Sequence, residues 1–211
     1  MPVLLDARLD WKLACAALYR ADLVVARLID RYPGEALEPH GDVFRTLLRS
    51  IVGQQISVAA AERIWARMIA RLGTPTPRAV LAAGEAALVA CGLTRRKAAH
   101  AGAIALLFRD AAVDTGAWRH ADDEAVAAAL QALPGIGRWS ADMVMIFALG
   151  RPDVLPAADI GLQRAVARHF GIARSELDKA RLEAVADRWR PWRSVATWYL
   201  WRDLDPVPVA Y

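Results

Sequence analysis

Cysteine is scarce in this sequence of 211 residues, which contains only Cys15 and Cys91. Two isolated thiols cannot form a disulfide framework, and they cannot provide the four closely spaced ligands of an iron–sulfur cluster. The four histidines show none of the paired spacings that bind zinc. We therefore expect a protein that needs no redox or zinc cofactor.

Long apolar runs are also absent, because no stretch approaches the roughly 18 residues that cross a bilayer. The N-terminus carries acidic residues early and lacks the apolar core of a signal peptide. These absences predict a soluble, cytoplasmic protein without a membrane partner. Lys and Arg outnumber Asp and Glu by 27 to 23, an excess too small to identify a nucleic-acid-binding protein by itself.

The alternating pattern of β-strands is missing, whereas apolar residues recur at helical spacing throughout. Several of these periodic runs follow residues that cap helices well, such as Asp42, Ser57 and Thr94. The sequence therefore predicts an all-α protein of ten or more short helices. We expect them at residues 9–19, 22–32, 42–52, 58–71, 78–83, 85–91, 95–108, 121–132, 138–149, 160–169, 175–189 and 191–203.

The stretch LPGIGRWSAD, which begins at Leu133, indicates a glycine-rich turn between two helices. Gly135 and Gly137 would let backbone N–H groups approach an anion closely, since no Cβ stands in the way. The positive end of the following helix would point at the same place, so phosphate is the expected ligand. The alternative interpretation is a turn that only connects two helices.

Asp159 is the one carboxylate in the otherwise apolar run LPAADI. It is either a functional carboxylate or the N-cap of the helix expected at 160–169. Asp142, on the helix after the turn, is a weaker candidate for the functional carboxylate.

Five motifs together resemble the helix-hairpin-helix DNA glycosylases, and within them the 3-methyladenine DNA glycosylase II branch. The likeness extends over residues 42–202. The motifs are IVGQQISV from Ile51, GLTRRKA from Gly92, LPGIGRWSAD from Leu133, PAAD from Pro156 and PWRS from Pro191.

The resemblance implies two helical lobes with a cleft between them and no N-terminal β-domain. Residues 42–130 would form a central lobe, and residues 131–211 would contain the hairpin and a catalytic C-terminal lobe. Residues 1–41 would pack with the C-terminal lobe.

The resemblance also implies the reaction, which is removal of alkylated purines such as 3-methyladenine and 7-methylguanine from duplex DNA by base flipping. Asp159 would stabilise the positive charge that develops on the sugar and would orient or deprotonate the attacking water. Relatives that also cut the backbone have a nucleophilic lysine after the residue that matches Arg138. Trp139 stands there in this sequence. A monofunctional hydrolase that leaves an abasic site is therefore implied.

Trp139 and Trp201 match pocket tryptophans of the family, and an indole face attracts a cationic base. Met143 and Ile160 replace two further aromatic residues, and Phe44 completes the expected base pocket. The alternative for any one of the tryptophans is core packing.

The resemblance gives the remaining site residues two roles. Gln55 would be the wedge that fills the gap left by the flipped base, although a merely polar loop is an equal alternative. The hairpin residues Gly135, Ile136, Gly137 and Ser140 would contact phosphate. The backbone carbonyls expected to hold a monovalent cation, Na⁺ or K⁺, are those of Gln131, Leu133 and Ile136.

Two other functions are compatible with these motifs. A non-catalytic helix-hairpin-helix module would bind DNA without Asp159 and Trp201 having any chemical role. A glycosylase for another class of lesion is also possible, although the missing lysine and the missing cysteine cluster argue against it. The expected partner in every case is double-stranded DNA, bound by a monomer.

Overall fold

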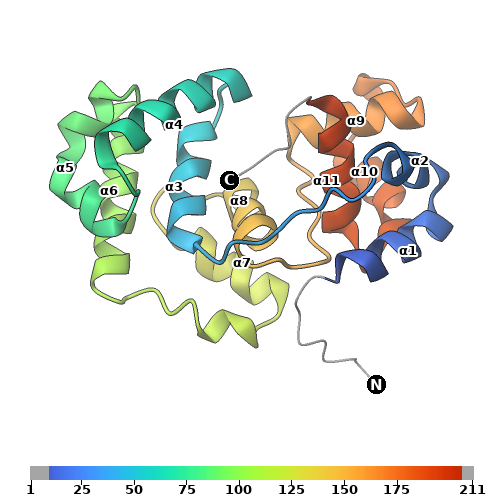
Figure 1. The fold of residues 1–211 in the computed structure, drawn as a ribbon, viewed down its shortest axis with the longest axis horizontal. Coiled ribbons are helices and arrows are strands. Elements are labelled where there is room, and N and C mark those ends of the chain that lie inside the picture. The colour runs from blue at the N-terminus through green and yellow to red at the C-terminus, as the bar shows by residue number, and fades with distance from the viewer. Residues whose placement is uncertain (1–9, 206–211) are drawn as a thin grey trace. The chain divides into compact units, whose positions relative to one another are not determined.

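The structure is a computed structural model that describes residues 10–205, and every regular element within that range is a helix (Figure 1). The all-α class is therefore confirmed. None of the described helices has the length and hydropathy needed to cross a bilayer. The described chain forms two compact units, in which residues 42–144 make up unit 2 and the segments on either side of it make up unit 1.

Unit 2 is built around its first helix, α3. The side chains of Leu47, Leu48 and Ile51 on this helix are almost fully buried. α3 packs against α4, α6 and α8, and α5 lies beside α6 (Figure 1). The helices of unit 2 are α3 (Val43–Gly53), α4 (Val58–Leu72), α5 (Pro77–Ala90), α6 (Arg95–Arg109), the 3₁₀ turn η1 (Ala117–Arg119), α7 (Asp123–Gln131) and α8 (Arg138–Met143).

Unit 1 is built around its last helix, α11, whose residues from Ser194 to Trp201 are all buried. A helix that is buried all round must form the centre of a core, and α11 packs against α1, α2 and α9. The elements are α1 (Trp11–Ala21), α2 (Leu23–Arg31), α9 (Ile160–Phe170), α10 (Lys179–Ala186), α11 (Arg193–Leu204) and the 3₁₀ turns η3 (Arg174–Glu176) and η4 (Asp187–Trp189). The π-helical stretch η2 (Val144–Ala148) continues α8, and the boundary between the units falls within it.

The starts of the helices follow the capping residues closely. Asp42, Ser57 and Thr94 each accept a hydrogen bond from a backbone N–H in the first turn of α3, α4 and α6, as expected from the sequence. The break expected near residue 84 is present as well, because Gly84 interrupts α5 with φ 74° and ψ 167°. Such a backbone conformation favours glycine.

Two predicted helices are wrong in part. The helix expected at 175–189 is divided into η3, α10 and η4, because Asp178 caps a new helix by accepting from the Arg181 N–H. The helix expected to begin at residue 191 begins at Arg193 instead. Pro191 precedes it, after a cis peptide bond from Arg190.

The observed division of the chain also differs from the expected one. Residues 131–144 belong to unit 2 rather than to a C-terminal lobe. The physical reason is packing, since α8 contacts α3 and α7. Residues 1–9 and 206–211 of the expected segments lie outside the described part of the chain.

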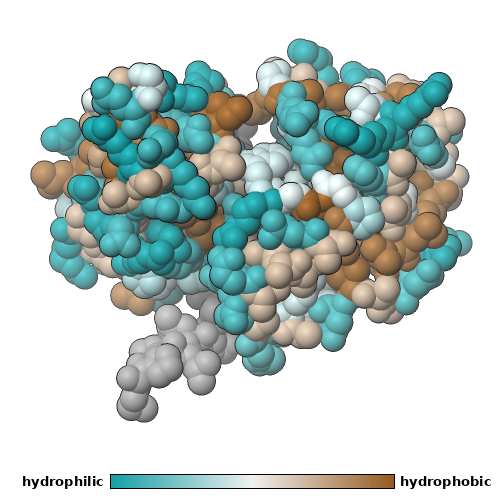
Figure 2. Space-filling view, turned by 180° about the vertical axis from the view of Figure 1, so that it is seen from behind, coloured by the Kyte–Doolittle hydropathy of each residue, from teal (hydrophilic) through white to brown (hydrophobic). Residues whose placement is uncertain are grey.

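Hydrophilic and apolar residues are interspersed over both units on the face drawn in Figure 2. Large apolar side chains are exposed at a few positions, including Val58 at the start of α4 and Ile160 at the start of α9.

Candidate active site

The glycine-rich turn connects α7 to α8 as predicted, and its backbone leaves two N–H groups available. Gly135 has φ +75°, a conformation that suits glycine, and Gly137 is extended. The Ile136 N–H donates to the Leu133 carbonyl oxygen at 3.2 Å. Neither the Gly135 nor the Gly137 N–H donates to another described residue. The turn can therefore offer these two N–H groups to an acceptor outside the protein.

Side chains near the turn fix its position in unit 2. A methyl group at Gly135 would lie 2.1 Å from His100 Nδ1, so the imidazole of α6 rests directly against this glycine. The side-chain amide of Gln54, just after α3, donates to the Gly135 carbonyl oxygen and to Ser140 Oγ, both at 3.0 Å. The segment after α3 and the hairpin are thus joined by hydrogen bonds.

The phosphate contact expected for Ser140 stays a prediction. This side chain is 1% exposed and accepts the hydrogen bond from Gln54. In this structure the hydroxyl contacts another side chain of unit 2. The Ile136 side chain is buried as well, and its N–H is already used within the turn.

Gln55 is exposed and has a left-handed backbone with φ +57°. Glutamine rarely adopts this conformation, and its neighbours must therefore impose it. Gly53, two residues before Gln55, lies against the indole of Trp139, since a methyl group there would be 3.7 Å from Trp139 Cη2. Unit 2 therefore holds the expected wedge residue, the hairpin and Trp139 in one neighbourhood.

An ion pair between the exposed Arg138 and the buried Asp142 closes the hairpin. Arg138 Nε donates to Asp142 Oδ1 at 2.9 Å, and the other guanidinium nitrogens donate to both oxygens of Glu124 at 2.8 and 3.0 Å. Asp142 is 1% exposed, and burial raises its pKa to about 6 although Arg138 counteracts the shift. Asp142 therefore links α8 to α7 through Arg138, a role that differs from the catalytic one considered for it.

Asp159 in unit 1 is the N-cap of α9, so the capping interpretation of this residue is correct. Its Oδ1 accepts from the Leu162 N–H at 2.6 Å and from the indole N–H of Trp201 at 2.8 Å. The carboxylate remains half-buried. The residue that caps the helix can also take part in a reaction, because the two hydrogen bonds orient the carboxylate and leave it its negative charge.

Trp201 and Gly161 shape the surroundings of this carboxylate. The Trp201 ring is 6% exposed and stacks on Phe147, with ring centroids 5.8 Å apart and an angle of 12° between the planes. A methyl group at Gly161 would lie 3.0 Å from Asp159 Oδ1 and 3.4 Å from Trp201 Cδ1. Only glycine leaves full room for the hydrogen bond. The sequence did not reveal that Trp201 would contact Asp159 or that Gly161 would matter.

The other residues expected in the base pocket differ in exposure. Trp139 is half-buried, and Met143 lies one helical turn further along α8 with 1% exposure. Phe44 is buried and packs against Phe108 at 5.4 Å between centroids. The burial of Met143 and Phe44 fits core packing. Ile160 is 65% exposed and remains a predicted contact.

The expected cation site stays a prediction. The Leu133 carbonyl already accepts the Ile136 N–H, and the Gln131 side chain donates to the Ala127 carbonyl. Side chains of His, Cys, Asp and Glu form no metal-binding cluster within residues 10–205.

Comparison with known proteins adds independent information. Residues 48–191 match the family model described as HhH-GPD superfamily base excision DNA repair protein. The chain is 31% identical to DNA-3-methyladenine glycosylase 2 of Escherichia coli, over 84% of this chain and 63% of that protein. It is 29% identical to DNA-3-methyladenine glycosylase 1 of Schizosaccharomyces pombe, over 84% of this chain and 79% of that protein.

Solved structures show the same fold. The 3-methyladenine DNA glycosylase of Schizosaccharomyces pombe in complex with abasic DNA has a TM-score of 0.78 at 25% identity, covering 90% of this chain and 95% of that one. The 3-methyladenine DNA glycosylase of Archaeoglobus fulgidus has a TM-score of 0.74 at 28% identity, covering 92% and 74%.

Some relatives are much longer. A probable bifunctional transcriptional activator/DNA repair enzyme of Mycobacterium tuberculosis is 30% identical over 96% of this chain, which spans 41% of its length. The family model nevertheless covers more than half of this chain, including the hairpin and Asp159. The chain therefore belongs to the HhH-GPD superfamily of base excision DNA repair proteins.

Proposed function

We propose that this protein is a monofunctional DNA glycosylase that hydrolyses the N-glycosidic bond of alkylated purines in duplex DNA and leaves an abasic site. The observation that carries the proposal is the Asp159 carboxylate, held by the Leu162 N–H and the Trp201 indole N–H. The names of the relatives agree with it, because several are 3-methyladenine DNA glycosylases. Abasic DNA, the product expected here, accompanies one of the similar structures.

Asp159 would stabilise the positive charge that develops on the sugar. Departure of the base leaves a sugar with oxocarbenium character, and a fixed carboxylate near C1′ stabilises that charge. The two donors on Oδ1 are a backbone amide and an indole, and both are uncharged. They hold the carboxylate in place while its negative charge is retained for the transition state. The same carboxylate would orient or deprotonate the attacking water.

Trp139 decides between hydrolysis and a lyase reaction. An indole offers no nucleophile for a covalent intermediate with the sugar, so water is the only attacking group in this proposal. The half-buried ring would instead contact the flipped base. A cationic base over an indole gains about 0.5 to 2 kcal/mol.

The lesions that we expect the protein to prefer follow from the small number of aromatic side chains in the expected base pocket. Met143 is buried in the core of unit 2, and the aliphatic Ile160 adds no aromatic face. Discrimination would then depend on a weakened glycosidic bond, as in 3-methyladenine and 7-methylguanine, whose cationic bases leave readily. Neutral lesions such as hypoxanthine would be removed slowly.

Unit 2 would bind the DNA backbone and distort the duplex. The two available N–H groups of the hairpin, at Gly135 and Gly137, would donate to a phosphate. Gln55, exposed on its strained loop, would enter the space that the flipped base leaves.

The first prediction tests Asp159. In the Asp159→Asn variant we expect release of 3-methyladenine from methylated duplex DNA to fall by roughly 10² to 10⁴-fold, since the stabilising charge is lost. Asparagine caps helices as well as aspartate does, so the fold should be kept. Chromatography of the released bases measures the rate, and fluorescence anisotropy with abasic duplex measures binding.

Three outcomes would contradict the proposal or a part of it. Normal excision by Asp159→Asn would exclude this carboxylate as the stabilising group. Tight binding without base release by the wild-type protein would indicate a non-catalytic DNA-binding module. Equal rates on 3-methyladenine and hypoxanthine in matched duplexes would overturn the proposed preference for cationic lesions.

A further inference from the structure

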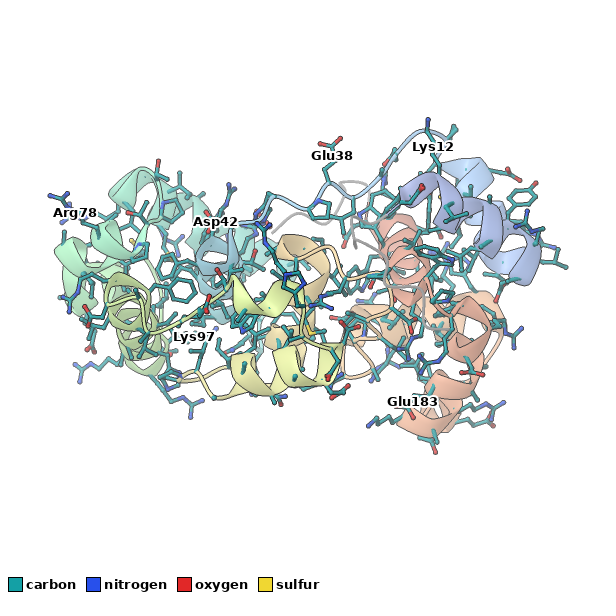
Figure 3. The ribbon with its side chains drawn as sticks, turned by 90° about the horizontal axis from the view of Figure 1, so that it is seen from below. Lys12, Glu38, Asp42, Arg78, Lys97 and Glu183 are labelled. Carbon is teal, nitrogen blue, oxygen red and sulfur yellow. The ribbon has the colours of Figure 1, made fainter. Side chains whose placement is uncertain are left out.

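Lys97 is buried in part on α6, although lysine is rare in this chain and usually extends into water (Figure 3). Its ammonium donates to the Val52 carbonyl at 2.9 Å and to the Gln54 carbonyl at 2.8 Å. These carbonyls belong to the end of α3 and to the residue after it. Burial lowers the pKa of Lys97, and two well-placed acceptors compensate for the lost hydration.

The position of Lys97 suits the end of α3. The last carbonyls of a helix lack partners within the helix, and the C-terminal end attracts a cation. The Lys97 ammonium binds one of these carbonyls, that of Val52, and also binds the carbonyl of Gln54, the first residue after the helix. A side chain of another helix, α6, therefore holds the loop from Gly53 to Ser57.

Gln54 continues the connection in the other direction. Its backbone carbonyl accepts from Lys97, while its side-chain amide donates to the Gly135 carbonyl and to Ser140 Oγ. A chain of hydrogen bonds thus runs from α6 through the loop to the hairpin, entirely within unit 2. His100, on the same helix as Lys97, rests against Gly135. α6 therefore supports both the loop and the turn.

The loop needs this support because Gln55 has a positive φ of 57°. An exposed residue with a long side chain would leave that conformation if its neighbours were free to move. Gln54 on one side is fixed at both its carbonyl and its amide. The left-handed conformation of Gln55 is therefore imposed by the contacts of Gln54 and Lys97.

We propose that Lys97 and Gln54 are positioning residues that hold the strained loop against the hairpin, so that Gln55 is presented to DNA in a single orientation. The inference extends the proposed function, since it assigns to these two residues the opening of the base stack. They touch neither the base nor the sugar. Their contribution is made before the chemical step, when the wedge must enter the duplex at a fixed distance from the bound phosphate.

The test compares Lys97→Met and Gln54→Met with Arg96→Met. Arg96 is exposed on the same turn of α6, so its variant removes one positive charge and leaves the loop contacts intact. We expect amide hydrogen exchange of residues 53–58 to become at least tenfold faster in the first two variants only. Exchange in α5 and the thermal midpoint should change little and report that unit 2 is folded.

Excision gives a second measurement. Opening of the stack is needed in duplex DNA and is not needed for an unpaired base, so the ratio of duplex to single-strand excision should fall about tenfold in Lys97→Met and Gln54→Met. Arg96→Met should keep the wild-type ratio. Because the two residues act in series, the double variant should be no worse than the poorer single one.

Three results would overturn the inference. Exchange of residues 53–58 in Lys97→Met equal to that in Arg96→Met would show that the ammonium does not hold the loop. An unchanged ratio of duplex to single-strand excision would show that the loop is held for another purpose. If the effects of the two substitutions add fully in the double variant, the two residues act independently of each other. If the wild-type protein releases no base, the proposed function fails, while the exchange comparison still tests the support of the loop.

Discussion

The two units hold their functional groups by different physical means. In unit 1, Asp159 is oriented by an amide and an indole, and the indole belongs to helix α11, which is buried from Ser194 to Trp201. In unit 2, the loop and the hairpin are held by an ammonium and by the Arg138–Asp142 ion pair. Neutral donors leave a carboxylate with its charge, which is what stabilisation of a cationic transition state requires. Charged supports are suited to loops, whose backbone carbonyls need strong donors.

The comparison predicts that substitutions in the two units change different measured quantities. Variants near Asp159 should lower the rate of excision and leave DNA affinity unchanged, whereas variants of the hairpin should lower affinity for every duplex. Four substitutions test this division, from the largest expected effect on excision to the smallest.

Trp201→Phe should have the largest effect after Asp159→Asn. Phenylalanine keeps an aromatic ring against Phe147 but removes the N–H that binds Asp159 Oδ1. A hydrogen bond to a charged group is worth about 1.5 to 3 kcal/mol, so single-turnover excision should fall roughly 10- to 100-fold. Trp198→Phe, which changes another buried tryptophan of α11, is the matched control. Equal losses in both variants would indicate a general packing effect.

Gly161→Ala should lower excision about tenfold and yet leave the protein as stable or slightly more stable. Alanine in a helix is favoured over glycine by about 0.5 to 1 kcal/mol. The new methyl group would lie 3.0 Å from Asp159 Oδ1 and would displace the carboxylate by a few tenths of an ångström. Thermal unfolding and single-turnover kinetics should therefore move in opposite directions. A loss of both thermal stability and excision rate would contradict the steric explanation.

Gly137→Val should weaken binding to all duplexes alike, whether or not they contain a lesion. The backbone at Gly137 is extended and no atom lies within 4 Å of a Cβ there, so the fold accepts valine. The side chain would keep a phosphate away from the N–H and reduce the slope of log affinity against log salt by about one or less. Loss of affinity only for damaged DNA would mean that the hairpin reads the base.

Asp142→Asn should change excision least, and its effect should appear in stability as a function of pH. Burial raises the pKa of Asp142 to about 6, so the native state binds more protons than the unfolded chain between about pH 4 and pH 6. Wild-type stability therefore declines as pH rises through this window, by at most about 3 kcal/mol from this group. Asparagine cannot titrate, so the variant should lack this part of the decline. Parallel stability curves for the two proteins would exclude the raised pKa.

The sequence was sufficient where structure depends on neighbours along the chain. Asp42, Ser57 and Thr94 cap helices that were predicted from them, and the turn at Gly135 lies between the expected helices. Local hydrogen bonds and glycine conformations need no distant partner. For the same reason, Asp159 could be recognised both as a cap and as a candidate for catalysis.

Contacts between distant residues could not be predicted in this way. The units divide after residue 144 and not at residue 131, because the packing of α8 on α3 joins segments far apart in sequence. Trp201 was expected to line a pocket, and the direction of its N–H toward Asp159 depends on how α11 is placed against α9. The available hints about Lys97 were the scarcity of lysine, which occurs only at three positions in this chain, and its place in the GLTRRKA motif. Those hints do not identify Val52 and Gln54 as its acceptors.

The double use of Asp159 has a practical consequence for handling the protein. An alanine at this position would remove the cap of α9 along with the charge, and a loss of activity could then be attributed to unfolding. Asparagine separates the two uses, because its side-chain oxygen still accepts the Leu162 N–H. If the proposed function holds, Asp159→Asn would bind alkylated duplex without releasing it as product. Immobilised on a solid support, that variant would serve as an affinity reagent for enriching damaged fragments from sheared genomic DNA.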